Sequence, residues 1–139
     1  MNKRFWLGFI IVAVFITLYE WVFHGIMLKG DYIATAHLWR PEAEMESYFA
    51  WMFAGQLLFS FIFCLLFTFT RCQTNFKDGA TYGLVIGLLM SSVSLVYYAV
   101  MPIPMSLLAG WILGGIIETI IAGAIFALVY IRTQHKDEL

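Results

Sequence analysis

The chain has 139 residues, a size typical of one domain. Hydrophobic residues make up 62% of it and charged residues only 12%, whereas soluble domains contain about 45–50% and about 25%. A soluble core of this size cannot bury so many apolar side chains, and a formal net charge of −1 without a basic stripe argues against a nucleic-acid partner. The composition therefore predicts a single transmembrane domain, residues 1–139, with the lipid bilayer as its solvent.

Four apolar runs follow one another, at about 5–28, 48–70, 80–101 and 105–131. Each reaches the roughly 20 residues that a helix needs to cross the hydrocarbon layer. Each is expected to be helical, because lipid offers no partner to a free backbone amide. The predicted fold class is all-α: an integral membrane antiparallel four-helix bundle with a long first outer loop.

The long loop, residues 29–47, is acidic and partly amphipathic. Its Arg40-Pro41-Glu42 stretch is typical of a helix start, with proline at the first position and acids in the first turn. We therefore expect the second helix to begin near Pro41, ahead of the membrane, and to run to about Thr70. The acids of this segment are interpreted as a solvated helix face, with a docking edge for a basic partner as the alternative.

Loop charges predict the orientation of the four spans, because short cytoplasmic loops carry an excess of Lys and Arg. Six of the eight positive residues lie on the side of the termini and middle loop: Lys3, Arg4, Arg71, Lys77, Arg132 and Lys136. The other side carries Lys29 and Arg40. Both termini are therefore expected in the cytoplasm, with the chain in an inner (plasma) membrane.

The last four residues, Lys136-Asp137-Glu138-Leu139, match an endoplasmic-reticulum retrieval signal. That signal is read in the lumen, whereas the loop charges place this tail in the cytoplasm. We interpret it as a solvated tail.

Small residues recur on the third and fourth spans. Gly79, Gly83 and Gly87 are spaced by four, and the fourth span carries Gly110, Gly114 and Gly115. Such stripes let two helix backbones approach closely in a membrane. Because Pro102-Ile103-Pro104 permits only a tight turn between these spans, they are expected to form a close hairpin.

In general plan, with four spans, a long first outer loop and a glycine-rich third span, the chain resembles several families of small uncharacterised bacterial inner-membrane proteins. The resemblance implies a multi-pass protein of the inner membrane. It rests on architecture alone and transfers no site residues.

Polar side chains recur at one depth in the outer half of the spans. At about 1.5 Å per residue, the acids, the glutamine and the serines lie roughly 10–16 Å inside the outer ends of their spans, and His24 lies about one turn from the end of its span. Glu20 and His24 share one face of the first span, because residues four apart are helix neighbours. The candidate binding layer consists of Glu20, His24, Gln56, Ser91, Ser94 and Glu118.

No Lys or Arg lies within any predicted span to neutralise Glu20 and Glu118. Two carboxylates without a cation cannot both stay ionised in a low dielectric. Either the acids are protonated or share a proton, or His24 is charged and pairs with one of them, or the layer binds an external cation. That cation could be a proton, an organic amine or a divalent metal held by Glu20, His24 and Glu118; no other cofactor is indicated.

Three functions remain open. The first is a binding or transport role, in which the acidic layer takes up a proton or cation from the outer side. The second is a non-catalytic accessory role, in which the chain forms a homo-oligomer or packs into a larger membrane complex through its glycine faces. The third, a metal-dependent membrane enzyme, ranks last because the sequence contains no GxGxxG, CxxC or HExxH motif and no nucleophile motif.

Overall fold

The structure is a computed structural model that describes residues 3–70, 73 and 75–132. About 90% of it is helical, and the described residues contain no strand. The C-terminal Lys136-Asp137-Glu138-Leu139 lies outside the described residues. In chain order the elements are α1 (Lys3–Val22), the π-helix η1 (Phe23–Met27), α2 (Lys29–Ala34), the 3₁₀-helix η2 (Ala36–Leu38), α3 (Glu42–Met45), the 3₁₀-helix η3 (Glu46–Tyr48), α4 (Phe49–Thr68), α5 (Phe76–Val100) and α6 (Met105–Arg132).

Four of these segments are long and apolar enough to cross a membrane: Lys3–Met27, Glu42–Thr68, Phe76–Val100 and Met105–Ile131. The predicted runs therefore coincide with helices to within a few residues, and the all-α prediction is confirmed. The second helical segment starts at Glu42, one residue after the Pro41 at which we expected it. Pro41 is instead the residue before the helix, with an extended ψ of 144°.

The closest helix pair is α5 with α6, and glycines of α5 make that approach possible. A side chain at Gly79 would collide with the backbone of Gly123, and one at Gly83 with the backbone of Thr119. A Cβ on Gly87 would come within 2.9 Å of the Ile116 Cα. Backbone therefore packs on backbone along this hairpin, which suits lipid because van der Waals contact, not water exclusion, holds membrane helices together.

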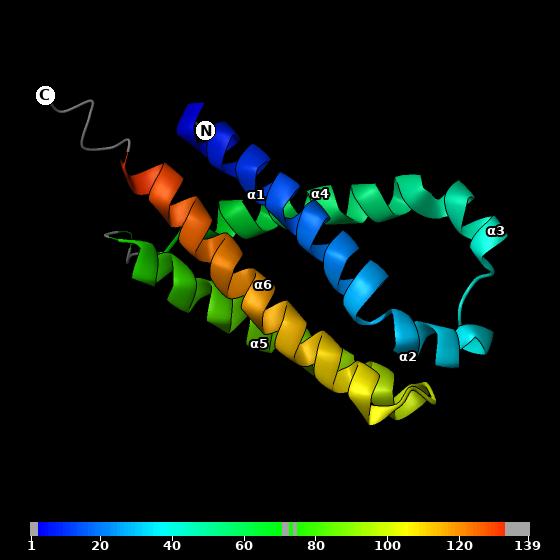
Figure 1. Ribbon diagram of the computed structural model, residues 1–139. Coiled ribbons are helices and arrows are strands. Elements are labelled where there is room, and N and C mark those ends of the chain that lie inside the picture. Colours follow the sequence, from blue (N-terminus) through cyan, green and yellow to red (C-terminus); the bar gives the residue numbers. More distant parts are fainter. Residues whose placement is uncertain (1–2, 71–72, 74, 133–139) are drawn as a thin grey trace, which may run out of the picture.

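The helices pack in the order α4, α1, α6, α5, with each neighbour antiparallel to the next. Along α1 and α6, Gly8 meets Phe126 near one end, while Phe23 meets Gly114 and Leu28 meets Gly110 near the other. The interposed α6 separates α5 from α1 (Figure 1). The structure is thus a row of helices over most of its length.

An aromatic core closes this row at the end that carries the N-terminus. Phe5, Phe63, Phe67 and Phe126 are fully buried there, from α1, α4 and α6. Tyr82 of α5 joins them and donates a 2.6 Å hydrogen bond to the Phe63 carbonyl. All four long helices therefore meet at this end.

Toward the other end, α4 diverges from α1 (Figure 1). There its side chains are exposed, among them Phe49, Trp51 and Phe53. In a bilayer this divergence has a small free-energy cost, because acyl chains are as apolar as the side chains that a closed bundle would bury. The helices consequently enclose a wedge between α1 and α4 at the end where α2 and α3 lie.

Candidate functional site

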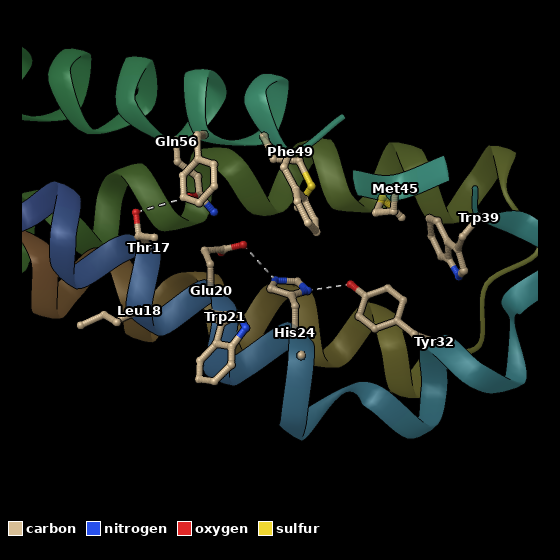
Figure 2. Close-up of a pocket in the computed structure, with 13 residues that line it drawn as sticks. Thr17, Leu18, Glu20, Trp21, His24, Tyr32, Trp39, Met45, Phe49 and Gln56 are labelled. Carbon is tan, nitrogen blue, oxygen red and sulfur yellow. Dashed lines mark hydrogen bonds and ion pairs between the residues drawn. The ribbon is translucent and has the colours of Figure 1, made fainter. Parts of the chain in front are cut away.

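The wedge contains a groove of about 780 Å³, within the size range of small-molecule sites. One wall comes from α1, η1 and α2, and the other from α3 and α4 (Figure 2). Most of the surface is aromatic, aliphatic or methionine side chain. The lining residues are Thr17, Leu18, Glu20, Trp21, His24, Gly25, Tyr32, Trp39, Met45, Phe49, Met52, Phe53 and Gln56.

A π-turn positions the imidazole in this groove. The N–H of Leu28 donates to the Phe23 carbonyl over 3.0 Å, five residues back in place of the usual four. Gly25, a weak helix former, lies at the centre of the turn. Single π-turns in α-helices are frequent at functional sites. Here the turn ends α1 and directs the chain into α2, whose residues then approach His24.

A chain of hydrogen-bonding groups runs along the floor of the groove (Figure 2). His24 Nε2 lies 3.4 Å from Glu20 Oε2, and His24 Nδ1 lies 2.6 Å from the hydroxyl of Tyr32. Trp111 of α6 donates its indole N–H to the same hydroxyl over 2.9 Å. Three elements therefore converge on His24 and Glu20.

The protonation state of Tyr32 determines which groups donate and which accept in this series of hydrogen bonds. Burial raises the pKa of Tyr32 to about 12; the Trp111 hydrogen bond acts against this shift, and Glu20 and Asp31 add to it. The phenol is therefore neutral at physiological pH and holds one hydrogen. Because Trp111 donates to its oxygen, that hydrogen is free for His24 Nδ1, the one acceptor that the described residues place there. We therefore assign the imidazole hydrogen to His24 Nε2, the ring nitrogen that faces Glu20.

Removing the hydroxyl in Tyr32→Phe is expected to destabilise the protein by about 1–3 kcal/mol, because it strands two partly buried partners at once. Trp111 loses its acceptor and His24 Nδ1 loses its donor. The free energy of unfolding in detergent micelles measures the loss.

Tyr48→Phe is the matched control, since Tyr48 is exposed and its ring keeps the Arg40 guanidinium 3.9 Å above it; its stability should stay within about 0.5 kcal/mol. The pH dependence has a definite sign. Tyr32 has a pKa of about 12 in the folded state against 10.0 for an unperturbed tyrosine, so its contribution is complete below pH 10 and lost as the pH rises toward 12. Equal alkaline slopes in wild type and Tyr32→Phe would contradict this assignment.

Glu118 of α6 is buried, with only 6% of its surface exposed. Its carboxyl lies close enough to the Glu20 carboxyl for the two groups to interact electrostatically. The second oxygen, Oε1, has no partner among the described residues. Nearby, Gly115 borders open space, whereas Ala122 is fully buried. The structure thus brings the two span acids together and leaves one buried carboxyl oxygen unpaired.

Gln56 lies in the groove, but the serines do not. Its side-chain oxygen accepts a 3.4 Å hydrogen bond from Thr17 across α1 and α4. Ser91 donates to the Gly87 carbonyl of its own helix. Ser94 borders a separate cavity of about 390 Å³ beside Trp111. The predicted layer therefore divides, because α6 stands between α5 and α1.

The predicted helix-packing glycines divide between two interfaces. Gly79, Gly83 and Gly87 face α6. Gly110 and Gly114 face α1 and η1, where they accommodate Leu28 and the ring of Phe23. Gly115 has no atom within 4 Å of the position its Cβ would take, so that side of the glycine borders open space.

The described residues contain no group of three or more His, Cys, Asp or Glu side chains arranged to hold a metal ion. Glu20, His24 and Glu118 therefore do not form the suggested metal triad in this structure. The reason is geometric: the two ring nitrogens of His24 face Glu20 and Tyr32.

Sequence reasoning missed the contribution of Tyr32 and of the indole of Trp111. The residue types themselves could have indicated this contribution, because a buried Tyr or Trp usually forms a hydrogen bond through the polar end of its ring. Trp39 was also missed. It contacts both Tyr32 and Trp111 and borders the groove as well as the smaller cavity.

Comparisons with protein-family models, with curated proteins and with solved structures found no match for this chain. The fold and the site together indicate a class: an all-helical membrane protein with four candidate spans and, between two of them, a largely apolar groove that carries a few polar side chains. What it binds must be argued from the geometry of the groove.

Proposed function

We propose that the chain is a multi-pass inner-membrane protein that binds a proton or cation at Glu20 and Glu118, in a binding or transport role. The observation that carries this proposal is the electrostatic interaction of these two acids, with Glu118 Oε1 buried and without a partner among the described residues. Buried acids in membrane spans are costly and usually functional. In our proposal the pair holds one proton and thus a single negative charge.

Access and charge support this function. Glu20 lies in the groove wall with its side chain 33% exposed, so an ion can reach the pair through it. None of the lining residues is Lys or Arg. In our proposal the termini face the cytoplasm, as the loop charges predict, and the groove therefore lies in the outer half of the bilayer. The likeness in plan to small bacterial inner-membrane proteins favours the inner membrane as the compartment.

Infrared spectroscopy of the protein in lipid nanodiscs across a pH series tests the proton. The wild type should show a protonated carboxyl at neutral pH, because two adjacent acids in an apolar layer cannot both be ionised. Glu118→Gln should remove that band, and Glu20→Gln should change the pH at which it disappears.

Glu44→Gln, in the exposed acidic helix α3, is the control and should leave the band and its titration unchanged. A neutral-pH spectrum without a protonated carboxyl, or one unaffected by both span variants, would overturn the proposed function.

A further inference from the structure

The groove combines a charged floor with apolar walls. Glu20 and Gln56 present oxygens from α1 and α4 (Figure 2). The surface around these two polar groups is apolar, with aromatic rings from Trp21, Phe49 and Phe53. A ligand that fills this space must therefore carry a positive or hydrogen-bond-donating head on a substantial apolar body.

An inorganic ion does not match these walls. Calcium takes six to eight oxygen ligands and magnesium keeps several waters, but Glu20 is the only carboxylate among the described residues that line the groove. No described cluster of acidic, His or Cys side chains is placed to hold a metal. A hydrated ion would also leave Trp21, Met52 and Phe53 in contact with water, which is unfavourable for apolar surface.

An ammonium group matches the floor. Its N–H donors can reach the Glu20 carboxylate, and charge-assisted hydrogen bonds are about twice as strong as neutral ones. Gln56 Oε1 accepts from Thr17 and keeps a second lone pair for another donor. Aromatic rings attract cations through their faces, and His24 Nε2–H occupies only one oxygen of Glu20.

We propose that the groove between α1 and α4 binds an amphipathic organic amine, with its ammonium group at Glu20 and Gln56 and its apolar body against Trp21, Phe49 and Phe53. This proposal rests on the proposed function and names its ligand class. The single negative charge of the Glu20–Glu118 pair neutralises the one positive charge of the ligand. The wedge between α1 and α4 gives the apolar body its route in, from the lipid side.

Three probes distinguish the contribution of the charged head to binding from that of the apolar tail: decylamine, decanol and the ammonium ion. Each is titrated against the full-length protein in nanodiscs, with Trp fluorescence and calorimetry as readouts, because Trp21 and Trp39 line the groove. Decylamine should bind at least about tenfold more tightly than decanol, and ammonium should not bind measurably, because the amine combines charge pairing with apolar burial.

Two variants locate the site. Glu20→Gln should weaken decylamine at least about tenfold and leave decanol unchanged, because only the amine uses the charge. Gly25→Leu should weaken both decyl probes by filling the groove. A Cβ at Gly25 meets no atom within 4 Å, so the backbone leaves room for the first atom of the added side chain. Gly30→Leu is its matched control, equally free of neighbours but outside the groove.

Equal affinity of decylamine and decanol, or full decylamine affinity in Glu20→Gln, would refute the amine. Binding of ammonium as tight as that of decylamine would also refute it, while leaving a cation site in place. The infrared band decides the proposed function separately: a protonated carboxyl without amine binding retains that function and removes this inference.

Discussion

Replacing Gly83 with alanine should destabilise the protein by about 3 kcal/mol, at the upper end of the usual cost of overpacking. The new methyl group would collide with the carbonyl of Thr119 and would lie 2.8 Å from the Ile120 Cα. Both obstacles are backbone, so no side-chain rotation relieves them. The α5–α6 hairpin would have to separate along its length, and thermal or SDS-induced unfolding in micelles would show the loss.

The matched control is Gly55→Ala in α4, where a Cβ has no neighbour within 4 Å. Alanine is the better helix former by about 1 kcal/mol, so this variant should be as stable as the wild type or more so. Wild-type stability in Gly83→Ala would mean that the two helix backbones do not approach as closely as described.

Replacing Glu118 with leucine should stabilise the protein by about 1–3 kcal/mol, the usual cost of a buried polar group without a partner. Leucine removes the orphan oxygen Oε1, while Glu20 keeps His24 and the open groove. The same variant should abolish the protonated-carboxyl band. If Glu118 is retained for its chemistry and not for the stability of the fold, its replacement should increase the stability and abolish the function.

Glu118→Gln distinguishes chemistry from packing. Its amide keeps the size and polarity of the carboxyl, so the stability should remain close to that of the wild type while the proton is lost. Destabilisation by Glu118→Leu would contradict this view, because it would show that the carboxyl contributes to the fold. Both variants are measured by unfolding and by infrared spectroscopy of the same samples.

The helical spans were predictable because lipid permits few alternatives. An apolar run of sufficient length must be helical, and the glycines spaced by four on the third span lie where α5 meets α6. The depth of Glu20 and Glu118 also predicted the two acids at one level, and in the structure they are close enough to interact electrostatically. Depth depends only on the rise per residue, which hardly varies between helices.

The direction in which each helix face points, and the order in which the helices pack, were not predictable in the same way. The serines of α5 were expected beside the acids of α1, but α6 lies between α5 and α1. The π-turn at Phe23–Met27 changes the path into α2, and with it the approach of Tyr32. Neither the neighbour of each helix nor a one-residue change in winding follows from the spacing of apolar residues.

The aromatic core at one end and the wedge at the other give α4 a mechanical role. Phe63 and Phe67 hold it at the closed end, and the fourteen residues from Phe63 back to Phe49 span about 21 Å. The core thus acts as a pivot for α4. If α4 tilts by about 5° at the core, its far end moves by about 2 Å over that length. Groove width should accordingly respond to bilayer thickness, since a thinner membrane favours more strongly tilted helices.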